Sequence, residues 1–385
     1  MSGILPMLLC GLLFWGAAYL LWSRRRAWSW LPALIGLLMM IYALGLVAND
    51  RDKRLAFGHY QQLQTAFSAE DLWLHIDEQP TEADLMLVGL SSMAFYRAAR
   101  RFPAHLDRIA GTMREMADWV SDPGRFPAWN DRRNWEQRTF FLSQAAIILG
   151  HYQLISLDEQ MAPRWQAAAE YLGRNMPRSP YKHLISRPSE DYFRVADNAA
   201  ALYAISLYDE YYAATYFEEA HSDWVAYIER ELQFEEGRLP CAAFSSTNRC
   251  KLEPNATALG LTYAYLAAAQ PEQSNPTGYR EWLHFFKRSS LSPFSLTISD
   301  NQRGKDPVSH CDEGAVPMVC GEYENAIGLW LAADQKGWYT YARLFSTLRI
   351  RERLNGPIDY QAWRPRQRIA PLTRLALETT GLLHE

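Results

Sequence analysis

The sequence lacks an excess of basic charge and several motifs that mark common enzyme classes. Its 385 residues include 39 Lys and Arg against 43 Asp and Glu, which gives a formal net charge of −4. A nucleic-acid-binding protein needs a basic face to neutralise phosphates, so this balance argues against nucleic acid as a partner. The sequence also contains no Walker loop, no Rossmann glycine pattern after a strand and no GxSxG elbow.

Cysteine is scarce as well. Cys10 lies in an apolar stretch, and the other four form local pairs nine residues apart, Cys241 with Cys250 and Cys311 with Cys320. An even number in local pairs of a polar, turn-rich sequence favours two loop-closing disulfides. Free thiols and a zinc site built from all four thiolates are the alternatives, although such spacings are poor zinc signals. Because no HExxH or similar spacing occurs either, we expect no metal.

Strand-like alternation and fixed repeats are also missing, and helical apolar spacing recurs instead from Leu55 onward. The expected helices are Asp84–Arg101, Ala104–Val120, Asn134–Ile155, Glu159–Asn175, Val195–Tyr216, Ala220–Phe234, Asn255–Ala269, Tyr279–Lys287, Tyr323–Ala333, Trp338–Ile350 and Ile369–Leu383. Several are apolar nearly all round, for example TFFLSQAAIIL, and such helices must be buried. The pattern predicts an all-α domain at 55–385, with helical hairpins closed into an (α/α)6 barrel. A superhelical repeat stack is the alternative, but no fixed period of about 34 or 40 residues supports it.

Two uncharged apolar stretches of 19 residues each, Ile4–Trp22 and Trp30–Ala48, open the chain. As helices they would each reach about 28 Å, close to the hydrocarbon thickness of a bilayer. A cleaved signal peptide is the alternative for the first stretch, but no basic residue precedes it and no cleavage site follows. Residues 1–54 are therefore predicted to form a transmembrane helical hairpin, with a bilayer as partner through residues 4–48. The Arg triplet in the connecting loop and the cysteine pairs favour a bacterial inner membrane with the large domain in the periplasm.

The stretch RPSEDYFRVADNAAALYAISLYDEYY is the most informative candidate for chemistry. Asp197 and Asn198 open an expected inner helix there, shortly after Tyr192 and Phe193. They could be a helix N-cap, because Asp and Asn satisfy free backbone N–H groups at that position. Alternatively, Asp197 points into the barrel mouth as a catalytic acid or base, where burial among aromatic rings would raise its pKa.

Three other clusters supply further candidates. Glu322 opens a helix after the loop HCDEGAVPMVCG, and it is the acidic residue there that we expect to face a cavity. Trp129 and Gln144 flank the entry to another inner helix, and Cys241 and Phe244 lie near a chain reversal. Polar groups in such places can orient a substrate hydroxyl, or they can form a satisfied buried network.

At these residues the sequence resembles the linalool dehydratase/isomerase family. The segments that carry the resemblance lie between residues 84 and 271: SMAFYRAA, MADW, SQAAIILGHYQLI, DYFRVADNAAALYAISLYD, DWVAYIERELQFEEGRLP and PNATALGLTYAYLAAAQP. The resemblance implies an (α/α)6 barrel, cofactor-free chemistry, a homo-oligomer and small terpene alcohols as substrates. Membrane-anchored isomerases of this family interconvert linalool and geraniol.

The residues of the family's catalytic site do not all match. Asp197 stands where the family has its second catalytic cysteine, and the first cysteine falls near Arg187 or Pro188. Gln144 falls near the family's histidine, while His59 and Tyr60 are closest to its aspartate. The resemblance therefore implies related chemistry carried by different groups.

Together these observations predict an isomerase that moves the hydroxyl group of an allylic monoterpene alcohol. One acid would protonate the leaving oxygen and one base would activate the returning water, with Asp197 partnered by Glu322 or Tyr192. Aromatic rings would stabilise the positive charge on the allyl skeleton. The rings expected to line this chamber are those of Trp129, Tyr192, Phe193, Tyr203 and Phe244. The alternatives are a carbohydrate-active enzyme with paired carboxylates and a non-catalytic binding module.

Overall fold

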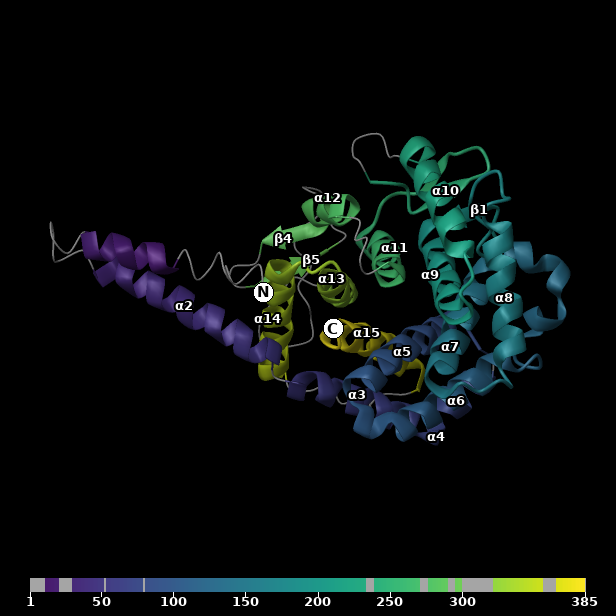
Figure 1. Ribbon diagram of the computed structural model, residues 1–385, viewed down its shortest axis with the longest axis horizontal. Coiled ribbons are helices and arrows are strands. Elements are labelled where there is room, and N and C mark those ends of the chain that lie inside the picture. The colour runs from purple at the N-terminus through teal and green to yellow at the C-terminus, as the bar shows by residue number, and fades with distance from the viewer. Residues whose placement is uncertain are drawn as a thin grey trace.

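The computed structural model describes residues 11–20, 30–51, 53–78, 80–232, 239–270, 276–289, 295–299, 321–355 and 365–384 (Figure 1). Most of these residues are helical. The helices are α2 (Trp30–Arg51), α3 (Lys53–Phe67), α4 (Glu70–Glu78), α5 (Glu82–Arg101), α6 (Leu106–Ser121), α7 (Thr139–Ser156), α8 (Ala162–Asn175), α9 (Val195–Tyr212), α10 (Tyr216–Glu231), α11 (Ala256–Ala269), α12 (Pro276–Phe286), α13 (Glu322–Asp334), α14 (Trp338–Asn355) and α15 (Pro365–Leu382). The short strands are β1 (Tyr192–Arg194), β2 (Ala243–Ser245), β3 (Cys250–Leu252), β4 (Lys287–Ser289) and β5 (Leu296–Ile298).

Alternate helices form a closed inner ring. Helices α5, α7, α9, α11, α13 and α15 each pack against the next one in this order, and α15 returns to pack against α5 (Figure 1). The intervening helices form the outer layer: α6 covers α5 and α7, α8 covers α7 and α9, α10 covers α9, α12 covers α11 and α14 covers α13. Helices α3 and α4 cover α15. The all-α class predicted from the sequence is confirmed, and the inner helices close as an α/α barrel requires.

The composition of the inner helices explains their place. Nearly every residue of α7 from Thr139 to Gln153 is buried, and α9 and α11 bury almost all of their apolar residues in the same way. A helix that is apolar on every side must be surrounded by other elements, which only the inner layer provides. The outer helix α6 buries one face only, so its charged residues remain on the surface.

Side-chain caps fix where two inner helices begin. Thr81 and Asp84 form a reciprocal capping box at the start of α5, and Asn255 accepts a hydrogen bond of 2.8 Å from the backbone of Ala258 at the start of α11. Such caps satisfy the free N–H groups of the first turn. The first turns of α5 and α11 are therefore defined by residues close to them in the chain.

A small sheet lies over the start of α9. Strand β1 pairs antiparallel with β2, and β2 pairs antiparallel with β3. Each strand has three residues, which is too short for an alternating pattern to be visible in the sequence. A disulfide joins Cys241 to Cys250, with 5.7 Å between the Cα atoms, so this part of the disulfide prediction is confirmed. Cys10, Cys311 and Cys320 lie outside the described residues.

The prediction for the N-terminal segment is wrong. Within the part of the chain that the structure describes, no helix is both long and apolar enough to cross a membrane. The predicted transmembrane hairpin of residues 1–54, and the inner-membrane location inferred from it, are therefore overturned.

Candidate functional site

The segment before β1 crosses the end of the ring where the inner helices begin. The backbone N–H of Thr139, the first residue of α7, donates to the carbonyl of Ile185 at 3.2 Å. The side chain of Asn198, in the first turn of α9, accepts from the backbone N–H of Leu184 at 2.9 Å and donates to its carbonyl at 3.1 Å. These bonds hold the segment across the ends of α7 and α9.

The same contacts decide between the two interpretations of Asp197 and Asn198. Helix α9 starts at Val195, so both residues lie inside its first turn and neither is the N-cap. Asn198 is fully buried and its side chain is occupied by backbone groups, so its role is to hold the crossing segment. Asp197 is left as the candidate for chemistry, with 9% of its side chain exposed.

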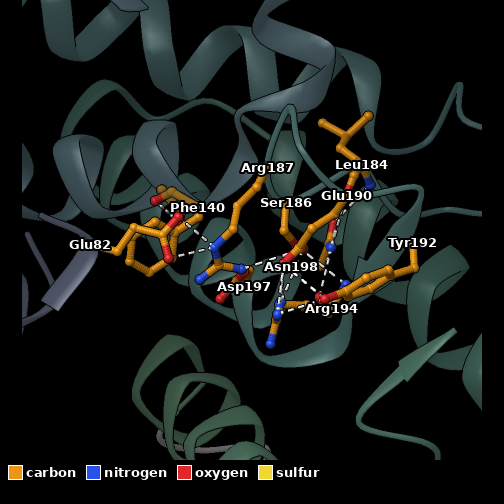
Figure 2. Close-up of polar contacts among 11 residues, drawn as sticks. Glu82, Phe140, Leu184, Ser186, Arg187, Glu190, Tyr192, Arg194, Asp197 and Asn198 are labelled. Atoms are coloured by element: carbon orange, nitrogen blue, oxygen red, sulfur yellow. Dashed lines mark hydrogen bonds and ion pairs between the residues drawn. The ribbon is translucent and has the colours of Figure 1, made fainter. Parts of the chain in front are cut away.

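Arg187 reaches from the crossing segment to Asp197. Its Nη1 donates to Asp197 Oδ2 at 3.1 Å, and its Nε lies 2.6 Å from the carboxylate of Glu82 at the start of α5 (Figure 2). The guanidinium also lies over the ring of Phe140, 4.6 Å from its centroid. Partners on three inner helices thus fix this arginine.

A second carboxylate meets the same arginine. Glu190 Oε2 lies 3.6 Å from Nη1 of Arg187, and the Glu190 side chain is 10% exposed. Glu190 also accepts from Nη2 of Arg194 at 2.6 Å and from the Tyr192 hydroxyl at 2.9 Å. Figure 2 shows these groups converging on one side of Asp197. We call the set the Asp197 cluster; its members are Glu82, Arg187, Glu190, Tyr192, Arg194 and Asp197.

The environments of the two carboxyl groups move their pKa values in opposite directions. Burial raises the pKa of Asp197, and it outweighs the lowering effects of the Arg187 charge and of a hydrogen bond from Ser186. Burial would also raise the pKa of Glu190, but the hydrogen bonds from Arg194 and Tyr192, with the nearby positive charges, hold that pKa below its usual value. Neighbouring groups whose pKa values are pushed apart are suited to act as acid and base.

Glu322 and His59, which the sequence suggested for the same site, belong to a different charged group. Glu322 pairs with Arg374 and lies 3.7 Å from Arg351, and Arg351 donates to Glu378 at 2.7 Å. His59 lies 2.5 Å from a carboxylate of Glu352 and 3.7 Å from Glu378. We call this set the His59 cluster; its members are His59, Glu322, Arg351, Glu352, Arg374 and Glu378. It ties α3, α13, α14 and α15 together.

Most of the aromatic candidates pack in the core. The indole N–H of Trp129 donates to a backbone carbonyl at 2.7 Å, and Phe193 stacks on Phe244 with 5.1 Å between ring centroids. Cys241 is in the disulfide, and Tyr60 packs among rings of α3, α5 and the following turn. These side chains are spread over several places and do not surround Asp197 as one chamber.

Gln144 and Tyr203 lie deeper in the ring. Gln144 donates to the hydroxyl of Tyr265 at 3.4 Å, and the Tyr203 hydroxyl lies 2.8 Å from Nε2 of His151. Tyr203 lines a cavity at the opposite end of the ring, where the inner helices finish. Asp197 is not among the residues that line that cavity.

Sequence reasoning missed four members of the Asp197 cluster as site residues: Glu82, Arg187, Glu190 and Arg194. The signal for the last three was present in RPSEDYFRVAD, where acidic and basic residues alternate just before an apolar helix. Within the described part of the chain, no cluster of His, Cys, Asp and Glu is arranged to hold a metal ion.

Comparison with known proteins adds no further constraint. No protein-family model matches the chain, and no curated protein matches it either. The resemblance to the linalool dehydratase/isomerase family therefore stays a prediction.

Proposed function

We propose that this protein is an enzyme that moves the hydroxyl group of a small allylic alcohol by acid–base chemistry at the Asp197 cluster. One observation supports the proposal above the others: Asp197 and Glu190 share a single arginine, yet their pKa values shift in opposite directions. An allylic shift needs a protonated acid and an ionised base in the same site, and the opposed pKa shifts favour Asp197 as the acid and Glu190 as the base.

The proposed steps conserve atoms and protons. Protonated Asp197 gives its proton to the hydroxyl oxygen of the alcohol, and the C–O bond breaks to leave water and an allyl cation. Water then attacks the other end of the allyl system and loses a proton to the carboxylate of Glu190. Transfer of that proton back to Asp197 through a water molecule restores the enzyme. Arg187 keeps the two carboxyl groups in place throughout.

The substrate class follows from the sequence resemblance and is part of the proposal. Linalool and geraniol carry the hydroxyl group at opposite ends of the same allylic system. Either alcohol should therefore be converted into the other without any change in oxidation state. The reaction as written uses only proton transfer and water, so the assay mixture requires no additional reagent.

The test is a product assay on the full chain with geraniol or linalool, followed by gas chromatography. Asp197→Asn should lower the rate about 100-fold or more, because loss of a general acid or base costs that much. Glu190→Gln should have a similar effect. Asp191→Asn is the matched control, since Asp191 is an exposed carboxylate in the same segment and should leave the rate unchanged. Absence of interconversion by the wild-type protein, or equal rates for Asp197→Asn and the wild type, would overturn the proposal.

Paired carboxylates also serve glycoside hydrolysis, so a second candidate is a carbohydrate-active enzyme that uses Asp197 and Glu190 on a glycosidic bond. Release of nitrophenol from aryl glycosides by the wild-type protein, lost in both variants, would favour this candidate. Conversion of the terpene alcohols without glycoside cleavage would favour the isomerase.

A further inference from the structure

A cavity opens at the end of the ring opposite the Asp197 cluster, where the inner helices finish. Its volume is about 290 Å³, close to the lower end of the range for ligand pockets. The side chains that line it come from α5, α9, α11, α13 and α15 and the turns that follow them, and none belongs to the Asp197 cluster. The reaction proposed at that cluster makes no use of this cavity.

Hydrogen bonds behind the cavity fix the direction of the Tyr203 hydroxyl. The Ser92 hydroxyl donates to the carbonyl of Gly89 at 2.7 Å, so it accepts from Nδ1 of His151, 3.0 Å away. Burial lowers the pKa of His151 to about 3, so the ring is neutral and its Nε2 carries a lone pair. Burial raises the pKa of Tyr203, so its hydroxyl keeps its proton and donates it to that nitrogen at 2.8 Å. The phenol oxygen can then only accept hydrogen bonds from a molecule in the cavity.

Asp334 supplies a second hydrogen-bond acceptor in the same wall. Its Oδ1 accepts from Nη1 of Arg97 at 2.8 Å, and its Oδ2 accepts from Nη2 of Arg97 at 2.6 Å and from the indole N–H of Trp330 at 2.7 Å. Because a carboxylate oxygen can accept two hydrogen bonds, Oδ1 has a lone pair for one more donor. The Asp334 side chain is 10% exposed and lines the cavity. The cavity therefore favours a ligand with at least two hydrogen-bond donors.

The charges around the cavity favour an uncharged ligand. Inner helices finish here, and the carbonyl groups at their C-terminal ends give the cavity a negative partial charge that opposes an anion. Lys336 is exposed at the opening and opposes a cation, whereas the charges of Arg97 and Asp334 cancel in the wall. A neutral hydroxyl group meets neither repulsion, and it can still donate to the two acceptors.

We propose that this cavity binds a small uncharged polyol. One hydroxyl group of the ligand donates to the phenol oxygen of Tyr203, and a second donates to Oδ1 of Asp334. A flexible polyol can place two hydroxyl groups at the spacing that these acceptors require. Ala268 and Leu383 lie against the C–H groups of the ligand. The site is separate from the Asp197 cluster, so it is independent of the reaction proposed there.

The test measures the binding of four matched compounds to the full chain by ligand-observed nuclear magnetic resonance titration, which suits the weak affinities of such small molecules. The compounds share a four-carbon chain: erythritol, butan-1-ol, erythronate and 4-aminobutane-1,2,3-triol. Erythritol should bind about fivefold tighter than butan-1-ol, the value of one additional hydrogen bond. Erythronate and the amine should each bind about threefold more weakly than erythritol, because the helix ends oppose the carboxylate and Lys336 opposes the ammonium group.

Three results would refute the proposal. The first is no binding of erythritol, and the second is an equal or higher affinity for butan-1-ol. The third is an affinity for either charged compound that equals or exceeds the affinity for erythritol.

Variants place the ligand in the cavity. Tyr203→Phe should weaken the binding of erythritol about fivefold, because one acceptor is lost. Ala268→Leu should weaken it about tenfold or more, because the added carbons occupy part of the cavity. Ala269→Leu is the matched control, since Ala269 is the next residue of α11 but does not line the cavity, and it should leave the affinity unchanged. Should Tyr203→Phe fail to fold, Ala268→Leu decides: an affinity equal to that of Ala269→Leu contradicts the site.

Discussion

Asp197 and Glu378 are both buried carboxyl groups beside arginine, yet their pKa values move in opposite directions. Asp197 has one arginine in contact and a second carboxylate nearby, and its pKa is raised. Burial would raise the pKa of Glu378 as well, but the charges of Arg351, Arg374 and His59 lower that pKa below its usual value. The number of positive partners, and not burial alone, decides whether a buried carboxyl group holds a proton.

This difference separates a candidate for chemistry from a structural group. The charges of three side chains hold Glu378 in its ionised form, and its contacts join helices that are distant in the chain, so the His59 cluster is suited to a structural role. Asp197 keeps a proton more readily than an ordinary aspartate and stands beside an ionised partner. The sequence suggested Asp197 and Glu322 as partners, but the structure gives Asp197 the nearer carboxylate of Glu190.

The largest expected effect is on stability at the His59 cluster. Glu378→Gln removes a carboxylate that is 4% exposed and leaves Arg351 and Arg374 without its charge. Breaking a buried ion pair from one side costs about 3–5 kcal/mol, which urea unfolding at pH 7 would measure. Glu136→Gln, at an exposed glutamate, should change stability by less than about 0.5 kcal/mol. If Glu378→Gln also lowered the free energy of unfolding by less than about 0.5 kcal/mol, the His59 cluster would not have the structural role that separates it from the Asp197 cluster.

Burial of a neutral histidine predicts that the folded protein loses stability in acid. His151 is fully buried, and burial with the charge of Arg97 lowers its pKa from 6.5 to about 3. The unfolded chain therefore binds a proton first as the pH falls below 6.5, and stability is lost between that value and about pH 3. At pH 5 this residue alone should cost about 2 kcal/mol relative to pH 7.5. His151→Gln should reduce the difference in unfolding free energy between the two pH values by that amount; an unchanged difference would show that His151 is not buried in its neutral form.

The smallest expected effects are opposite slopes of stability with pH. Because the pKa of Asp197 is raised above 3.8 in the folded protein, its contribution falls as the pH rises above that value. The pKa of Glu378 is lowered below 4.5, so its contribution falls as the pH drops below that value. The difference in unfolding free energy between the wild type and Asp197→Asn should therefore shift against the wild type as the pH rises. The difference between the wild type and Glu378→Gln should shift against the wild type as the pH falls.

Each slope should be at most about 1.4 kcal/mol per pH unit. Chemical unfolding of the three proteins at matched pH values would measure both slopes. Slopes of the same sign would contradict the opposed pKa shifts of Asp197 and Glu378, on which the comparison of the two clusters rests.

The helical class could be predicted from the sequence because its cause is local. The spacing of apolar residues sets which segments become helices, and segments that are apolar all round, such as that of α7, had to lie inside. The Cys241–Cys250 disulfide was suggested for a similar reason, since its two residues are close in the chain. The N-terminal segment shows the limit of this reasoning, because apolar composition there predicted a membrane hairpin that the described helices do not form.

The site depends on contacts that no local pattern contains. Asp197 was found because it stands at a change from polar to apolar sequence, but Arg187 could be assigned to it only once the crossing segment was placed over the start of α9. Likewise, Tyr203 and Phe193 are ten residues apart in the chain. Phe193 belongs to strand β1 at one end of the ring, whereas Tyr203 lines the cavity at the other end, because α9 runs between the two ends.

By itself, the sequence determined that this chain forms a layered set of helices with Asp197 at the start of an inner one, because helix formation and burial follow from neighbouring residues. Only the tertiary structure decided which charges surround each carboxyl group. Electrostatic partners are chosen by distance in space, and in this protein that distance joins residues as far apart in the chain as Glu82 and Arg187.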